Sequence, residues 1–221
     1  MSPSHDDNSS AGAPERVYIV DDDASFRRSL DRLLTSHGFP TTVFGSAEAF
    51  LSAGLAHRQG CLVLDVHMPG LTGLDLQGVL ERQECTLPVV FLTGRGDIPM
   101  SVRAMKAGAA DFLTKPVDED TLLQAVRKAL GRSRREVEAR READAIRARI
   151  RTLTEREHEV MRQVLTGQLN KQIGGALGIA EKTVKIHRGR VMEKLGVTSV
   201  AELVQLCTRA GIEPAPVRAD G

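Results

Sequence analysis

Short apolar runs alternate with stretches of helical periodicity over the first 126 residues. Each run has the length of a buried strand, and between the runs apolar residues recur at the three- and four-residue spacing of an amphipathic helix. The runs lie at residues 17–20, 41–44, 61–64, 89–92 and 111–113. Strands that alternate with helices predict an α/β fold, a five-stranded doubly wound parallel sheet in the flavodoxin-like order 2-1-3-4-5.

Turn and capping residues divide the stretches between the strands into helices. Gly38 can end the first helix, and Ser46 can cap a short second helix that runs to Leu55. A further helix is expected over residues 100–107, and the last helix of this half begins near Leu122.

The second half of the chain has only helical patterns. Residues 127–151 contain no Pro and a single Gly, and Glu and Arg recur four positions apart, as at Glu136 and Arg140. This stretch predicts an extended helix, either a solvated connector or a coiled-coil-like seam in a dimer. Both alternatives stay open because the apolar positions are sparse.

Capping signals after residue 152 predict four more helices. Thr154 and Glu157 form a capping box, Asn170 is expected to cap the second helix, and Ser199 is expected to cap the fourth. The second and third helices meet at a glycine turn, which predicts a helix-turn-helix, although helical hairpins of this length are common. The third helix, residues 181–195, is rich in Lys and Arg and suits a DNA major groove.

Three features weaken these helices. Ala180 offers no capping oxygen to the helix of residues 181–195, which costs about 1 kcal/mol. Gly174 and Gly175 cost up to about 1 kcal/mol each, unless close packing requires the absence of a side chain. Gly189 is expected to interrupt the third helix.

Charge is distributed unevenly along the chain. Residues 1–126 carry 10 Lys and Arg against 17 Asp and Glu, whereas residues 127–151 carry 10 against 4. An acidic first half and a basic second half indicate two domains with different partners, the basic one facing nucleic acid. The three cysteines lack metal-site spacing, and no signal peptide or membrane-spanning run is present, so a reducing cytoplasm is expected.

Polar side chains follow four of the predicted strands at their carboxyl ends. They are Asp21 and Asp22 after the first strand, Asp65 after the third, Thr93 at the fourth and Lys115 after the fifth. A single carboxylate there is most simply a helix cap, but parallel strands bring all five residues to one crevice. Clustered carboxylates suit Mg²⁺ or Mn²⁺, and Asp65 beside a cation, an ammonium and a hydroxyl is a candidate phosphoryl acceptor.

The segments VYIVDDD, CLVLDVHMPGLTG, VVFLTGRGD and AGAADFLTKP resemble the motifs of two-component receiver domains. The resemblance implies that Asp65 is phosphorylated and that Asp22, Asp65 and the backbone carbonyl of His67 bind the metal, with Asp21 in an outer role. It also implies that Thr93 and Phe112 are switch residues, that Lys115 contacts the phosphate, and that the Lys115–Pro116 peptide is cis.

Residues 152–210 closely resemble a LuxR-type helix-turn-helix domain. The DNA-facing residues that this resemblance implies are Asn170, Lys171, Lys182, Thr183, Val184, Lys185, His187, Arg188 and Lys194. Val184 could meet a thymine methyl group or pack inside the domain.

The whole order resembles response regulators of the FixJ/NarL class. It implies a disordered leader (1–14), a receiver domain (15–130), a helical linker (131–151), the DNA-binding domain (152–210) and a disordered tail (211–221). The implied function is phosphorylation-activated transcription regulation, with a sensor histidine kinase as phosphodonor and dimerisation through the face of residues 100–107 and 111–113. Double-stranded promoter DNA and RNA polymerase are the other expected partners.

Two rival functions share part of this pattern. A dehalogenase-type phosphatase would place its nucleophile after the first strand in a DxD arrangement, whereas Asp21 and Asp22 are adjacent. We therefore expect no enzyme activity beyond autophosphorylation and slow self-dephosphorylation. The second rival is a DNA-binding protein that is indifferent to phosphorylation, or one whose receiver only drains phosphate from another pathway. The presence of all the acceptor residues argues against it.

Overall fold

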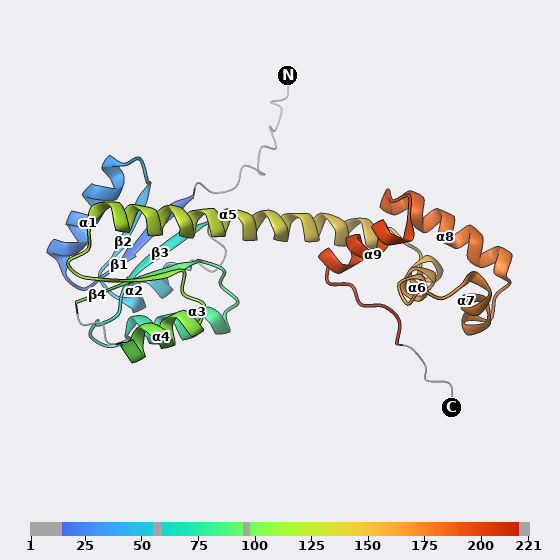
Figure 1. The fold of residues 1–221 in the computed structure, drawn as a ribbon, viewed down its shortest axis with the longest axis horizontal. Helices are drawn as coiled ribbons and strands as arrows, with labels where there is room; N and C mark the ends of the chain where they lie inside the picture. Colours follow the sequence, from blue (N-terminus) through green and yellow to red (C-terminus); the bar gives the residue numbers. More distant parts are fainter. Residues whose placement is uncertain (1–14, 55–58, 95–97, 217–221) are drawn as a thin grey trace, which may run out of the picture. The chain divides into compact units, whose positions relative to one another are not determined.

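The structure is a computed structural model that describes residues 15–54, 59–94 and 98–216. The chain divides into two compact units, Met1–Val137 and Glu138–Gly221. Helix α5 (Glu119–Ile150) begins in the first unit and ends in the second (Figure 1). Among the described residues, no helix combines the length and apolar content needed to cross a bilayer.

The first unit is built on a five-stranded, all-parallel sheet in the order β2-β1-β3-β4-β5, which confirms the predicted fold class and strand order. The strands are β1 (Arg16–Val20), β2 (Thr41–Phe44), β3 (Gly60–Asp65), β4 (Val89–Thr93) and β5 (Asp111–Thr114). β3 is buried along its whole length, as expected for a central parallel strand covered on both faces.

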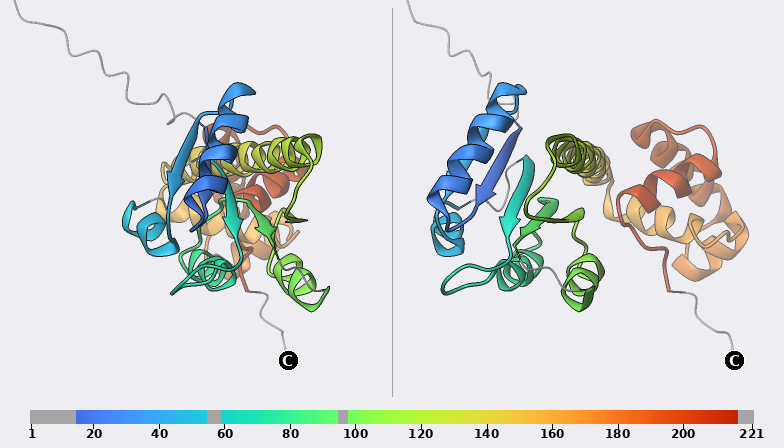
Figure 2. Two further views of the ribbon diagram at one scale, coloured as in Figure 1. Left: turned by 90° about the vertical axis from the view of Figure 1, so that its left-hand side faces the viewer. Right: turned by 60° about the vertical axis from the view of Figure 1, so that its left-hand side comes forward.

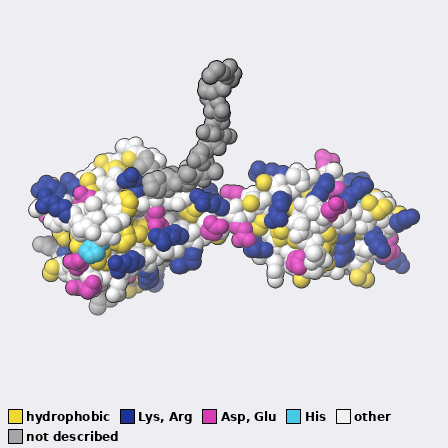
Figure 3. Space-filling view, turned by 90° about the horizontal axis from the view of Figure 1, so that it is seen from above, with side chains coloured by type: hydrophobic (Ala, Val, Ile, Leu, Met, Phe, Trp, Pro, Cys, Tyr) yellow, Lys and Arg dark blue, Asp and Glu magenta, His cyan; other side chains and the backbone are white. Residues whose placement is uncertain are grey.

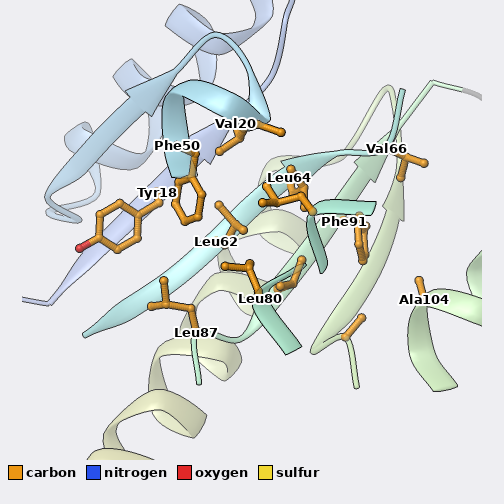
Figure 4. Packing of buried hydrophobic residues seen from close by; sticks show 14 of the residues in the cluster. Tyr18, Val20, Phe50, Leu62, Leu64, Val66, Leu80, Leu87, Phe91 and Ala104 are labelled. Carbon is orange, nitrogen blue, oxygen red and sulfur yellow. The ribbon is translucent and has the colours of Figure 1, made fainter. Parts of the chain in front are cut away.

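Helices cover both faces of this sheet (Figure 2). They are α1 (Ala24–Ser36), α2 (Ala47–Ser52), α3 (Gly73–Arg82), α4 (Ile98–Lys106) and the first half of α5. Because successive strand residues point to opposite faces, Leu62 and Leu64 pack toward α2, α3 and α4, whereas Cys61 and Val63 pack toward α1 and α5. Figure 4 shows the first of these clusters, in which Phe50 of α2 lies beside the sheet.

Several element boundaries differ from the sequence expectation by one to three residues. α2 ends at Ser52, and Leu55 lies outside the described residues. α4 begins at Ile98 and ends at Lys106 instead of spanning residues 100–107. The Lys115–Pro116 peptide is cis, as the receiver motif implied.

The second unit consists of the end of α5 and four further helices. These are α6 (Glu155–Val164), α7 (Asn170–Leu177), α8 (Glu181–Leu195) and α9 (Val200–Arg209). The predicted capping box forms, since Thr154 Oγ1 accepts from the Glu157 N–H and Glu157 Oε2 accepts from the Thr154 N–H. Gly178 has a φ of 66° at the turn between α7 and α8, a left-handed conformation that favours glycine.

Two expectations about these helices were wrong. Asn170 is the first residue of α7 and not its cap; Leu169 precedes the helix, and its N–H is satisfied by Gln172 Oε1 at 2.8 Å. α8 continues through Gly189 without a break, because helical hydrogen bonding tolerates a glycine that costs only backbone entropy.

The predicted linker is shared between the two units. Residues 138–142 are all exposed. Further on, Ile146 and Ile150 are buried in the core of the second unit, together with Val160 and Leu203. The last apolar positions of α5 therefore form part of a domain core.

Residues 211–216 of the expected disordered tail contact the rest of the second unit at two half-buried positions, Ile212 and Ala215. Ile212 lies against its core, and the Ala215 N–H donates to the Arg162 carbonyl at 3.0 Å. Arg162 in turn donates from Nη2 to the Pro214 carbonyl at 3.1 Å. A cation that satisfies successive backbone carbonyls fixes this short segment despite its low apolar content; residues 217–221 lie outside the described part of the chain.

Candidate functional site

A crevice at the carboxyl edge of the sheet collects the polar residues that follow the strands. Asp21 and Asp22 follow β1, Asp65 ends β3, Thr93 ends β4 and Lys115 follows β5. Because β1, β3, β4 and β5 are successive neighbours in the sheet, their carboxyl ends lie side by side.

The three carboxylates form a compact cluster. Asp21, Asp22 and Asp65 each offer an oxygen, and these oxygens all lie within 4.8 Å of one another. Asp21 and Asp65 are buried while Asp22 is exposed, so the cluster opens to solvent on one side. An all-oxygen, anionic donor set of this kind fits a hard divalent cation such as Mg²⁺.

The third acidic residue of the DDD run has a different role. Asp23 caps α1, and its Oδ1 accepts from the N–H groups of Ser25 at 2.8 Å and Phe26 at 3.1 Å. These two hydrogen bonds lower the pKa of the Asp23 carboxyl. The helix-cap alternative therefore applies to Asp23 and not to Asp65.

Lys115 joins the two buried carboxylates. Its Nζ lies 2.7 Å from Asp21 Oδ2, 3.1 Å from Asp65 Oδ1 and 4.1 Å from the centre of the Phe26 ring. Burial alone would lower the pKa of this ammonium, but its hydrogen bonds with Asp21 and Asp65, and their charges, raise it overall. Lys115 therefore stays protonated and supplies a positive charge directly beside Asp65.

Burial also affects Asp65. It raises the pKa of the Asp65 carboxyl, and the charges of Asp21 and Asp22 act in the same direction, whereas Lys115 opposes them. A carboxylate that is less well stabilised than in water is a better nucleophile, provided that neighbouring cations keep it ionised.

Thr93 ends β4, the neighbour of β3, and Phe112 lies on the adjacent strand β5. The Thr93 side chain is fully buried, and its Oγ1 lies 3.2 Å from Nδ1 of His67. Phe112 is half-buried, with its ring centroid 6.0 Å from that of Phe91. Sequence reasoning assigned His67 only a backbone role; the contact between its imidazole and Thr93 depends on strand pairing and had no local signal.

A second set of candidate residues lies on α7 and α8 of the other unit. Lys171, Lys182 and Lys185 are exposed, and Thr183 and His187 are partly exposed. Arg188 Nη1 donates to Asn170 Oδ1 at 3.1 Å, so the asparagine expected to cap α7 instead orients this guanidinium. Figure 3 shows Lys and Arg side chains (dark blue) on the surface of this unit, interspersed with acidic ones.

Val184 does not belong to the exposed face of α8. Its side chain is fully buried with Val191 and Leu195, so it packs inside the domain and cannot reach a base. Ile186 is the exposed apolar residue instead, at 48%. Two residues correspond to about 200° around a helix, so the spacing of Val184, Val191 and Leu195 already pointed to Ile186 as the outer position.

Lys194 also differs from its expected role. Its Nζ lies 2.6 Å from Oε2 of Glu157 and 3.2 Å from the carbonyl of Thr152, and both contacts tie α8 to the start of α6. This ammonium is engaged within the domain because Glu157, although buried, needs a cationic partner.

Two family models match the chain. The model described as "Response regulator receiver domain" matches residues 17–127, and the model described as "Bacterial regulatory proteins, luxR family" matches residues 151–207.

Curated relatives are similar over nearly the whole chain. Nodulation protein W of Bradyrhizobium diazoefficiens is 47% identical, over 89% of this chain and 86% of its own. The transcriptional regulatory protein FixJ of Azorhizobium caulinodans is 44% identical, over 90% of this chain and 94% of its own.

Two solved structures are also similar to most of this chain. The response regulator StyR matches with a TM-score of 0.75 and 46% identity, over 89% of this chain and 100% of that one. Full-length FixJ from B. japonicum matches with a TM-score of 0.55 and 40% identity, over 90% and 98% of the two chains.

Proposed function

Because the chain belongs to the two-component response regulators that carry a receiver domain and a LuxR-type DNA-binding domain, we propose that phosphorylation of Asp65 controls promoter binding by α8. The observation that carries this proposal is the position of Lys115, whose Nζ contacts both Asp65 and Asp21 in a cluster of three carboxylates. An anionic nucleophile with an adjacent cation is the arrangement that phosphoryl transfer requires.

The proposed reaction is a phosphoryl transfer from a phosphohistidine of a sensor kinase. An Asp65 carboxylate oxygen attacks phosphorus, the P–N bond breaks, and the histidine nitrogen of the kinase leaves and takes up a proton. Asp22, Asp65 and the His67 carbonyl would hold a Mg²⁺ or Mn²⁺ ion, with Asp21 in an outer position; the ion supplies charge neutralisation at the phosphoryl oxygens. Lys115 pairs with one of those oxygens.

We propose that Thr93 and Phe112 act as the switch. The Thr93 hydroxyl, which lies beside His67, turns to donate to a phosphoryl oxygen on Asp65, and the space that it leaves admits the half-buried ring of Phe112. We propose that the face of α4 and β5 then changes and mediates dimerisation. Val102 and Met105 of α4 are 44% and 46% exposed, which supports a contact role for this helix.

In the dimer, two copies of α8 enter successive major grooves. Lys171, Lys182 and Lys185 neutralise phosphates, and Arg188 approaches the DNA in the orientation that Asn170 imposes. Ile186, with Thr183 and His187 beside it, contacts base edges, and its side chain meets a thymine methyl group.

We further propose that the regulator acts in the cytoplasm and contacts RNA polymerase at the promoter. Its only chemistry would be autophosphorylation and slow hydrolysis of the acyl phosphate. The residue boundaries 15–130, 131–151 and 152–210 remain our proposed division into receiver, linker and DNA-binding segments.

The test is a DNA footprint of the full chain with and without a small-molecule phosphodonor. Wild type should gain protection with the phosphodonor, and Asp65→Asn should not, because an amide cannot accept the phosphoryl group. Asp120→Asn, an exposed first-turn residue of α5, is the matched control and should behave as wild type. Phosphodonor-stimulated binding by Asp65→Asn would refute the proposal.

A further inference from the structure

The loop between β3 and α3, residues 66–72, links Asp65 to α3 and is anchored at both ends. At its start the Val66 N–H donates to the Leu92 carbonyl at 3.2 Å. At its end Thr72 caps α3 in a capping box with Asp75. The Val66 carbonyl also accepts from the Gly73 N–H at 3.0 Å, which closes the loop, and His67 Nδ1 lies 3.2 Å from Thr93 Oγ1. Between these contacts and Thr72, a residue from elsewhere in the sequence hydrogen-bonds to the loop.

That residue is Glu48, in the first turn of α2. Its Oε1 accepts from the Leu71 N–H at 3.0 Å, across 23 positions of sequence. Gly70 has a φ of 76°, and a Cβ there would lie only 2.9 Å from the same oxygen, so the carboxylate lies close against bare glycine backbone. Glu48 therefore contacts the loop at Gly70 and Leu71, beyond His67 in the sequence.

The Glu48 side chain is itself held in place. The pKa of the Glu48 carboxyl lies below its ordinary value, because the backbone N–H groups of Glu48 and Leu71 and the Ser46 hydroxyl favour its charged form. α2 is held to the sheet by Phe50, which is buried with its ring centroid 5.4 Å from that of Phe44 and 6.1 Å from that of Tyr18. A charged hydrogen-bond acceptor on a helix that is packed against the sheet restricts the backbone at Leu71 more than a water molecule would.

We propose that Glu48 is a positioning residue for cation binding: it holds the loop that carries the His67 carbonyl in one conformation beside Asp21, Asp22 and Asp65. This inference rests on the proposed function. Groups that orient the ligands of a metal without touching the metal contribute substantially to its affinity. Glu48 would act one step further out, by holding the backbone of Leu71 in the loop that carries His67.

The experiment compares full-length wild type, Glu48→Ala, Glu48→Gln and the control Glu119→Gln, which removes a first-turn carboxylate from α5. Calorimetric titration measures the Mg²⁺ dissociation constant. We expect a rise of about tenfold for Glu48→Ala, the low end for outer-shell partners. Glu48→Gln should fall in between because its amide oxygen still accepts a weaker hydrogen bond, and Glu119→Gln should match wild type.

A second readout separates positioning from general stability. With a small-molecule phosphodonor, the Mg²⁺ concentration for half-maximal phosphorylation should rise in the Glu48 variants while the maximal rate recovers at saturating Mg²⁺. Lower thermal stability with an unchanged Mg²⁺ dissociation constant would overturn the inference. Should Glu48→Ala fail to fold, the isosteric Glu48→Gln carries the test.

Failure of the inference is distinguishable from failure of the proposed function. If wild type takes up no phosphoryl group at Asp65, the proposed function fails whatever the Glu48 variants do. If wild type is phosphorylated and the Glu48 variants share its Mg²⁺ dependence, only the role of Glu48 is refuted.

Discussion

Lys194 places its ammonium nitrogen 2.6 Å from a carboxylate oxygen of Glu157, a side chain that is only 3% exposed. The same carboxylate accepts the Thr154 N–H at 2.9 Å, so it caps α6 and binds α8 at once. This pair engages a lysine of the basic helix within the domain, and it leads to the first two predictions.

Replacing Lys194 should affect stability more than DNA binding. Lys194→Met leaves the Glu157 carboxylate without its cation and should lower the free energy of unfolding by about 1–3 kcal/mol. Lys185→Ala, at an exposed position, should leave stability within about 0.5 kcal/mol of wild type and weaken DNA binding, with a salt slope smaller by about 1. Urea unfolding by circular dichroism and anisotropy of labelled promoter DNA test the pair; the reverse pattern would contradict our assignment.

The capping box should make stability depend on pH in the acidic range. Lys194 and the Thr154 N–H lower the pKa of Glu157 below its ordinary value of 4.5. A depressed folded-state pKa contributes stability that is present above about pH 4.5 and is lost as the pH falls through the folded-state value. The stability difference between wild type and Glu157→Gln should therefore be constant above about pH 5 and shrink below it. A difference that grows on acidification would show that the carboxylate is not stabilised.

Divalent cations should stabilise the first unit selectively. Tyr18 is the only tyrosine, the chain has no tryptophan, and Tyr18 is buried in the sheet, so its fluorescence reports the unfolding of this unit. At about 100 times its dissociation constant, Mg²⁺ should raise the free energy of unfolding by about 2.7 kcal/mol. Removal of Mg²⁺ by a chelator should reverse the gain, and Asp22→Asn should largely abolish it. An equal gain in Asp22→Asn would exclude this carboxylate as a ligand.

Neighbouring glycines of α7 should respond in opposite directions to alanine. A Cβ at Gly174 would lie 2.8 Å from the Ile179 carbonyl, whereas at Gly175 it would meet nothing within 4 Å. Gly174→Ala should therefore destabilise the domain by about 1–3 kcal/mol, and Gly175→Ala should stabilise it by about 0.4–1 kcal/mol. Chemical denaturation of the two variants checks this; stabilisation by both would mean that the tight approach of α7 and α8 is easily relieved.

Substitutions at the two apolar residues near the start of α8 should have separate effects, one on stability and the other on DNA binding. Val184 is fully buried, so Val184→Ala should cost roughly 2 kcal/mol of stability. Ile186 is exposed, so Ile186→Ala should keep stability and weaken binding to the specific promoter by about 1 kcal/mol or more. Competition with non-specific DNA gives the measurement. Equal loss on specific and non-specific DNA would argue against a base contact by Ile186.

The local sequence pattern was sufficient to predict the helices and strands and most of the residues of the crevice. The strands, the capping box at Thr154 and the turn at Gly178 follow from residue spacing and backbone preference, and the alternation of strands and helices indicated the doubly wound strand order. The structure has all of them. Burial was harder to predict. The sequence allowed Val184 either to contact a thymine methyl group or to pack inside the domain, and nothing local distinguished Lys194 from the other cations of the basic helix. Their surroundings come from α5, α6 and α7, which no pattern within α8 reveals.

The amino-acid sequence by itself determined the class of each unit and the position of Asp65 at the carboxyl end of a strand, because hydrophobic period and strand-end position are local properties of the chain. Only the tertiary structure decided which polar groups are engaged. It brought Lys115 to Asp21 and Asp65, Lys194 to Glu157, and Glu48 to Leu71. Such pairs depend on distances between elements far apart in sequence, and these distances exist only after the apolar faces have packed.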